Sequence, residues 1–174
     1  MTITTNTPTP TPAPPTVGDI VYRFRGQLGE LNPVGLFDDG IRFFNQFEGD
    51  IVDGPFAGGR ISGPDFFVLR PSGVGEIHAP ELIEFEDHRV VLDVRGYLVG
   101  PAGLTVPPLD VVLTPGFEFP DVEFRVTASA LAATTSPGFD HLNAAVIAVE
   151  GTVNMGTGAM DVTARVLDAP AARP

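Results

Sequence analysis

The chain is divided by 20 glycines and 18 prolines into short segments in which apolar and polar residues alternate. Such alternation is typical of β-strands with one buried face, and no segment shows the period of a long amphipathic helix. Strands are predicted at residues 20–25, 42–47, 66–70, 76–85, 89–99, 108–113, 121–127, 143–149 and 160–166, with a further short element that begins at Ile61. About eight to ten short strands favour an all-β sandwich or barrel. We expect a single antiparallel barrel with a central cavity, because closure leaves no sheet edge exposed.

The length of 174 residues is enough for one domain with a substantial core. We expect the barrel domain to span residues 17–168 and the C-terminus to be frayed over residues 169–174. Residues 1–16 are rich in threonine and proline and predict a disordered, extended tail, which could also be a tether for a partner or a lid over a pocket. Residues 100–108 predict a loop at a barrel mouth, and residues 128–140 could hold one helical turn.

The ten basic residues are all arginines, cysteine is absent, and the net charge is −12. Without lysine or cysteine, Schiff-base and thiolate chemistry and disulfides are excluded. The acidic balance argues against nucleic acid and anionic membranes as partners, since both require a basic surface. The first residues lack the basic start of a secretory signal, and no apolar run is long enough to span a membrane. We expect a cytoplasmic bacterial protein, monomeric or homodimeric.

One carboxylate falls on the apolar face of a predicted strand. Ile77, Ala79 and Ile83 share that face by two-residue alternation, and Glu81 lies among them. An ionised carboxylate there is costly unless it is paired, hydrogen-bonded or protonated, so Glu81 is a candidate catalytic acid or base with a raised pKa. Two alternatives remain open, namely an ion pair with an arginine or a bulge after Pro80 that turns Glu81 outward.

Three polar residues of the next predicted strand are further candidates. Asp93, Arg95 and Tyr97 share one strand face. If the lumen of the barrel is polar, Asp93 and Tyr97 would be catalytic acceptor and donor for a substrate oxygen, and Arg95 would bind the substrate. The alternative is that the three residues form a solvated face and the apolar residues between them face the core.

The other candidates for substrate binding are Glu123, Arg125, Asn143, Phe43 and Phe47. Glu123 and Arg125 leave the same choice open between a polar lumen and a solvated face. Asn143 begins an apolar run, where a buried amide must find either a ligand or backbone groups as partners. Phe43 and Phe47 alternate onto the apolar face of their strand, where we expect them to line the cavity.

The sequence contains no motif for a metal or a nucleotide cofactor. His78, His88 and His141 lack the spacing of metal ligands, and the glycine pair at residues 58–59 does not open a helix that could bind phosphate. Ser62 is a turn residue without the strand–turn–helix context of a nucleophilic serine. We therefore expect neither a metal nor a cofactor.

Five stretches of the chain, in order, carry a resemblance to a known family: GPFAGGRISG, VLRPSGVGEIHA, RVVLDVRGY, FRVTASA and FDHLNAAVIAVEG. Together they resemble the small bacterial β-barrels catalogued as domain of unknown function 3237, over residues 43–167. The chain departs from the family pattern at His141, which replaces an aromatic residue, often tryptophan, and at Asp87-His88, which replaces an Asp-Gly turn. A Gly-Pro pair also precedes the Gly-Gly pair of the first hairpin, although a second Gly-Pro follows it.

The resemblance implies a barrel of about nine or ten antiparallel strands around a cavity, and no particular reaction. In size and tail the chain is also similar to compact barrels of polyketide pathways, including cyclases that form spiroacetals or cycloadducts. A cavity lined by apolar side chains with isolated carboxyl groups suits an apolar substrate with a few oxygens.

We therefore expect a cofactor-independent cyclase or isomerase that acts on a polyketide intermediate, for example by acid-catalysed spiroacetal formation. One alternative is a non-catalytic binding protein for an apolar small molecule. Another is an interaction module recruited through the N-terminal tail.

Overall fold

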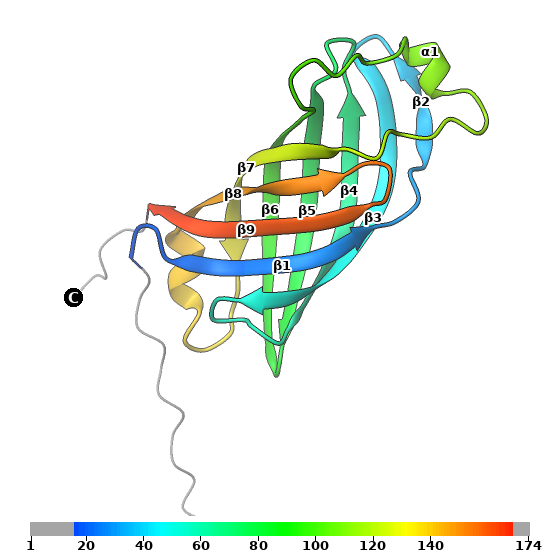
Figure 1. Ribbon diagram of the computed structural model, residues 1–174. Coiled ribbons are helices and arrows are strands. Elements are labelled where there is room, and N and C mark those ends of the chain that lie inside the picture. Colours follow the sequence, from blue (N-terminus) through cyan, green and yellow to red (C-terminus); the bar gives the residue numbers. More distant parts are fainter. Residues whose placement is uncertain (1–15, 169–174) are drawn as a thin grey trace, which may run out of the picture.

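Eight antiparallel strands close into a barrel in the computed structural model, which describes residues 16–168 (Figure 1). The strands are β1 (Ile20–Leu28), β2 (Pro33–Phe37), β3 (Gly40–Asp53), β4 (Arg60–Leu69), β5 (Gly75–Phe85), β6 (His88–Val99), β7 (Glu123–Ala133), β8 (Val146–Asn154) and β9 (Ala159–Asp168). The helices in the described part are one turn of α-helix, α1 (Leu109–Val112), and one 3₁₀ segment, η1 (Asp140–Ala144). The predicted all-β barrel is confirmed.

The ring is closed by strand β1, which pairs with β9 on one side and with β3 on the other. From β3 to β9, each strand pairs with the next one along the chain, so the topology is a simple up-and-down meander. Strand β2 lies outside the ring and forms a hairpin with the first residues of β3. Closure pairs both edges of every ring strand along much of its length, which protects the sheet from edge-to-edge association.

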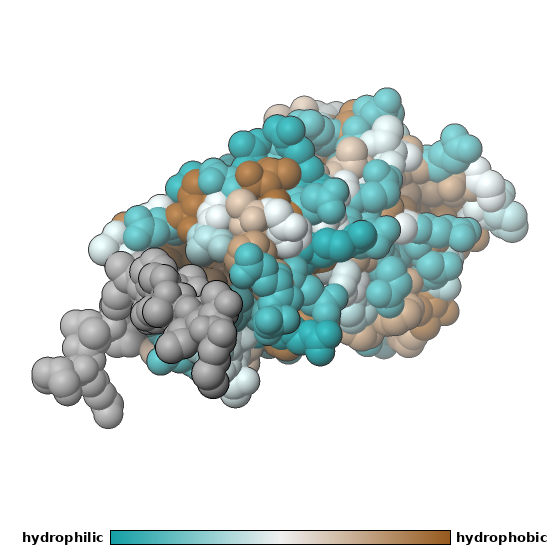
Figure 2. Space-filling view, turned by 90° about the horizontal axis from the view of Figure 1, so that it is seen from below, coloured by the Kyte–Doolittle hydropathy of each residue, from teal (hydrophilic) through white to brown (hydrophobic). Residues whose placement is uncertain are grey.

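The predicted alternation of faces is clear on β3, where Phe43, Asn45 and Phe47 are buried and Arg42 and Phe44 are exposed. The inward side chains of the eight strands form one continuous apolar core. Figure 2 shows that hydrophilic residues cover much of the opposite, outer surface on the face drawn there. Within residues 16–168, no helix has the length and apolar character needed to cross a membrane.

Three predicted elements differ in the structure. The two elements predicted from Ile61 onwards and at residues 66–70 form one continuous strand, β4 (Arg60–Leu69), because its ladder with β3 runs unbroken through Gly63 and Pro64. Residues 108–113 form α1 and its flanks, so the prediction of a strand there is wrong. Strand β7 continues to Ala133, and the helical segment comes after it, at η1. The predicted tail before Thr16 and the predicted C-terminal residues 169–174 lie outside the described residues.

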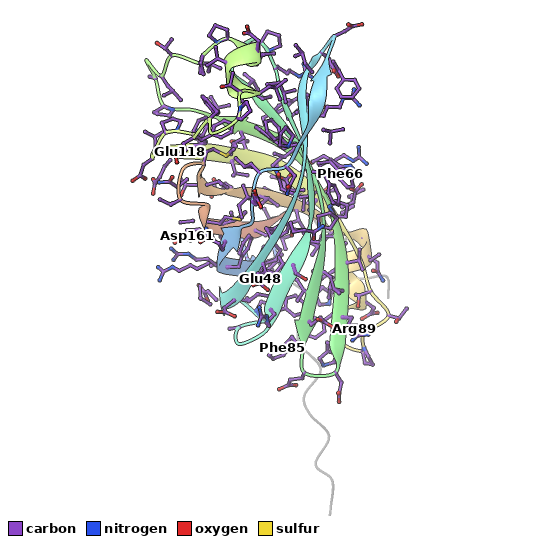
Figure 3. The ribbon with its side chains drawn as sticks, turned by 90° about the vertical axis from the view of Figure 1, so that its right-hand side faces the viewer. Glu48, Phe66, Phe85, Arg89, Glu118 and Asp161 are labelled. Carbon is purple, nitrogen blue, oxygen red and sulfur yellow. The ribbon has the colours of Figure 1, made fainter. Side chains whose placement is uncertain are left out.

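The two ends of the barrel are built differently. The segment between β3 and β4 and the segment between β7 and β8 lie at the lower end in Figure 1. In these segments Phe56 and Phe139 are buried with their ring centroids 4.5 Å apart, so aromatic side chains fill this end. The upper end is covered by residues 100–122, which connect β6 to β7 and contain α1. Figure 3 shows Phe85 and Arg89 at the lower end, with Glu118 towards the other end. The loop predicted at residues 100–108 therefore does lie at a mouth of the barrel.

Candidate active site

Glu81 of β5 lies inside the barrel, with only 5% of its surface exposed. Its neighbours on the strand keep a continuous register with β6, in which Pro80 faces Asp93 and Glu81 faces Leu92. The chain therefore makes no bulge after Pro80, and the alternative of an outward-facing Glu81 is wrong. The prediction that alternation places this carboxylate on the apolar side is confirmed.

A second carboxyl group, that of Asp65 on β4, faces the same cavity as Glu81. Asp65 lies opposite Asn45 in the β3–β4 ladder and shares its face with Ile61 and Phe67. Asp65 is not among the site residues predicted from the sequence, because the sequence Gly-Pro-Asp is typical of a turn. Counting back by two from the buried Phe67 would have placed Asp65 on the inner face.

The strands that carry the two carboxyl groups are incompletely paired beside them. The β4–β5 ladder stops after Ser62 and resumes at Phe66 in the same register, and Pro64 and Pro80 lie in the gap. Neither proline has a backbone N–H, so the ladder cannot be complete here. The backbones also approach closely, since a Cβ added to Gly63 would lie 2.0 Å from the carbonyl oxygen of Pro80. Glycine is therefore required at position 63 for Asp65 and Glu81 to keep their places.

Tyr22 connects β1 to the site. Its side chain is fully buried, and its hydroxyl donates a hydrogen bond of 2.7 Å to Oε2 of Glu81. Strands β3 and β4 separate β1 from β5 in the ring, so this hydrogen bond crosses the interior of the barrel. Burial and the nearby Glu81 charge raise the pKa of Tyr22 well above its usual range, so the hydroxyl remains a donor.

The interior perturbs the pKa values of both carboxyl groups. Burial raises the pKa of Glu81 to about 7, with the Tyr22 hydrogen bond opposing this rise and the charge of Asp65 adding to it. Burial raises the pKa of Asp65 to about 6, against the lowering effects of the Asn45 amide and the charge of His78. Both groups can thus gain and lose protons near neutral pH, which is the property that general acid–base catalysis requires.

Asn45 holds Asp65 from the neighbouring strand. Its amide is fully buried, with Nδ2 at 3.5 Å from Oδ2 of Asp65 and Oδ1 accepting a hydrogen bond of 3.1 Å from the backbone N–H of Asn32. The other oxygen of Asp65, Oδ1, is buried and has no hydrogen-bond partner within the described part of the chain. A buried acceptor without a partner costs about 1–3 kcal/mol, so this oxygen is suited to receive a donor from a ligand.

The cavity next to the two carboxyl groups has a volume of about 50 Å³ and is otherwise lined by apolar side chains. This is room for a few water molecules or for the head of a ligand. A second cavity of about 190 Å³ lies beneath residues 104–120, and a wider recess of about 1000 Å³ opens beyond it. Met155 lines all three spaces, so they adjoin one another between the mouth and the carboxyl groups, and we refer to the three together as the path.

The predicted aromatic residues lie along this path. Phe47 lines the inner cavity beside the carboxyl groups, and Phe43 lines the outer recess. Both side chains are buried, as their alternation on β3 predicts.

Five other predicted site residues lie outside the cavity. Asp93, Arg95 and Tyr97 of β6 and Glu123 and Arg125 of β7 are all exposed on the outer surface. The idea of a polar lumen on these strands is therefore wrong, because the apolar residues between them take the inward positions. Asp93 instead pairs on the surface with His78 at 2.7 Å and with Arg95 at 3.2 Å.

Asn143 is also remote from the carboxyl groups. It lies exposed in η1, where its Oδ1 accepts a hydrogen bond of 2.7 Å from the backbone N–H of Thr134 and its Nδ2 donates one of 2.9 Å to the carbonyl of the same residue. The amide thus forms hydrogen bonds with backbone groups in the loop after β7. Of the two partners considered for Asn143, a ligand or the backbone, the structure shows the backbone.

Replacing Tyr22 with phenylalanine should raise the pKa of Glu81 further, because the hydroxyl that favours the ionised carboxylate is removed. We also expect the free energy of unfolding at neutral pH to fall by about 1–3 kcal/mol, since the buried carboxylate loses its donor. NMR titration of the Glu81 carboxyl carbon and urea unfolding would measure the two effects. Tyr97→Phe is the matched control, since that hydroxyl lies on the outer surface; an unchanged Glu81 pKa in Tyr22→Phe would contradict the assigned role.

Comparison with known proteins places the fold but assigns no activity. No family model matches the chain, and no curated protein matches it. Among solved structures, it is similar to a β-barrel-like protein from Acinetobacter baumannii AYE (22% identity, TM-score 0.66, covering 88% of this chain and 98% of that one). It is also similar to a conserved protein of unknown function from Rhodopseudomonas palustris (20% identity, TM-score 0.63, covering 88% of this chain and 99% of that one). A third similar structure is an enzyme from Penicillium herquei (17% identity, TM-score 0.51, covering 88% of this chain and 98% of that one). At these identities the likeness shows the barrel fold alone.

Proposed function

We propose that the barrel is a cofactor-independent cyclase or isomerase for an apolar, oxygenated substrate of the polyketide type. The observation that carries the proposal is the pair of carboxyl groups, Asp65 and Glu81, facing one apolar cavity with pKa values of about 6 and about 7. Two carboxyl groups that face one cavity and that can each gain and lose a proton near neutral pH can supply the acid and the base of one reaction. The similarity in size and tail to barrel-shaped polyketide cyclases supports the same class of reaction.

Spiroacetal formation is the concrete reaction that we assign to this pair. The substrate is a ketone with two hydroxyl groups, one of which has already added to the carbonyl to give a cyclic hemiacetal. Protonated Glu81 donates its proton to the hemiacetal hydroxyl. The bond between this oxygen and the former carbonyl carbon then breaks, water departs, and an oxocarbenium ion remains. The second hydroxyl attacks this carbon, and its proton passes to ionised Asp65. The apolar wall of the cavity holds the carbon chain of the substrate in a folded conformation and leaves one face of the cation open to attack.

The test uses the symmetrical nine-carbon ketone with a hydroxyl group at each end. Without a catalyst, its two six-membered rings close to equal amounts of both mirror-image spiroacetals. With the full chain near neutral pH, we expect faster closure and an excess of one enantiomer, measured by chiral gas chromatography. Racemic product at the uncatalysed rate would contradict the proposed reaction for this substrate class. Binding with unchanged recovery of the ketone would favour the alternative of a non-catalytic carrier.

A further inference from the structure

The whole path from the mouth to the interior is acidic. Asp65 and Glu81 line the inner cavity, and Glu30, Glu118 and Asp121 line the outer recess. Glu118 also lines the cavity between them, and Figure 3 shows it away from the Phe85 end of the barrel. None of the described residues that line these three spaces is an arginine or a histidine.

The arginines of the described chain are used elsewhere. Seven of them pair with carboxylates outside the path, in the ion pairs Arg23–Asp161, Arg25–Asp161, Arg42–Asp39, Arg60–Glu48, Arg70–Glu76, Arg89–Glu84 and Arg95–Asp93. An anionic group that entered the path would therefore meet carboxyl groups, and no arginine or histidine of the described lining would be there to pair with it. Like charges in a cleft of low dielectric repel strongly and lower the rate and affinity of binding.

A second, independent feature points to the ligand. Oδ1 of Asp65 is buried without a partner at the inner end of the path, while Oδ2 lies next to the Asn45 amide. A ligand with a hydrogen-bond donor can satisfy this free acceptor, whereas a carboxylate or a fully ionised phosphate has no donor to offer. A hydroxyl group supplies one donor and an ammonium group three, the latter with a charge that complements the site.

We infer that the barrel selects ligands whose head group is a hydrogen-bond donor without negative charge, and that it rejects carboxylates and phosphates. The inference concerns the site of the proposed function and narrows its substrates to neutral or cationic compounds, so that an acidic head group must be absent or masked before the substrate enters. The apolar part of such a ligand would lie in the cavity beneath residues 104–120, among Leu69, Val112 and Phe124.

The test compares three unbranched nine-carbon chains that differ only in the head group, an amine, an alcohol and a carboxylic acid. Binding to the full-length chain would be measured by calorimetry slightly above neutral pH, at concentrations below micelle formation. We expect the ammonium compound to bind at least about tenfold more tightly than the carboxylate, with the alcohol between them. Ammonium binding should also release protons, seen as a heat that depends on the buffer, because the cation stabilises the ionised forms of Asp65 and Glu81.

Equal or tighter binding of the carboxylate, or no binding of any of the three chains, would overturn the inference. An Asp65→Asn variant should lose most of the preference for ammonium, whereas Glu84→Gln on the outer surface should keep it. The comparison on the unaltered chain decides the matter even if Asp65→Asn fails to fold. If the head groups bind in the expected order but no cyclisation occurs, this inference holds and the proposed reaction is contradicted. If cyclisation is enantioselective but the carboxylate binds tightly, the proposed reaction holds and this inference is contradicted.

Discussion

Glu81→Gln is expected to slow the proposed cyclisation by about 100- to 10,000-fold and to abolish the enantiomeric excess. The amide keeps the size of the side chain, and the Tyr22 hydroxyl can still donate a hydrogen bond to its oxygen. Only the exchangeable proton of the carboxyl group is lost. The measurement is the initial rate and the enantiomer ratio for the nine-carbon dihydroxyketone, compared between the variant and the unaltered chain.

The matched control for this substitution is Glu84→Gln on the same strand. Glu84 is exposed and pairs with Arg89 on the outer surface, so the chemical change is identical but lies outside the cavity. We expect this variant to retain the rate and the enantiomer ratio. Retention of both by Glu81→Gln as well would show that the carboxyl group of Glu81 takes no part in proton transfer.

The second large effect is on stability, because Glu81 should make the folded state less stable as pH rises. The pKa of Glu81 has the ordinary value of 4.5 in the unfolded chain and rises to about 7 in the folded protein. Between pH 4.5 and about pH 7, the folded protein therefore binds more protons than the unfolded chain. Stability from this group is therefore fully present below about pH 4.5 and is lost as pH rises through about 7. Between about pH 5 and about pH 8, we expect the loss to be about 2–3 kcal/mol.

Urea unfolding of the unaltered chain and of Glu81→Gln across this pH range isolates the contribution of Glu81. The free energy of unfolding of the unaltered chain, minus that of the variant, should decrease with rising pH by the amount given above. The variant should be the more stable protein at the alkaline end, because it has no charge to bury. A difference that stays constant with pH, or increases with it, would mean that Glu81 is not protonated on burial.

Local alternation was sufficient to predict the architecture and one of the two carboxyl groups. Every residue of β5 from Glu76 to Phe85 could be assigned to a face from the sequence, because each strand has one face against the core. The same pattern on β3 placed Asn45 on the inner face, although its role beside Asp65 depends on which strand lies next to β3. Alternation thus predicts where a side chain points, and pairing between strands decides what it meets.

The residues that the sequence did not reveal depend on contacts between distant parts of the chain. Asp65 was hidden by Gly63 and Pro64, whose usual turn preference is overridden here by pairing with β3. The contact of Tyr22 with Glu81 spans the interior of a closed barrel and has no local signal. Asp93 was a candidate because alternation alone cannot decide which of two faces is the lumen, and in β6 the apolar face is the inner one.

The central claim is that Asp65 and Glu81 hold and exchange protons near neutral pH inside an apolar barrel. NMR titration of the side-chain carboxyl carbons tests it most directly, with Asp65→Asn and Glu81→Gln to assign the two signals. Burial predicts midpoints of about 6 for Asp65 and about 7 for Glu81, well above the ordinary values of 3.8 and 4.5. Midpoints of both groups at their ordinary values would contradict the claim, because both carboxyl groups would then be permanently ionised at neutral pH and Glu81 could not act as an acid.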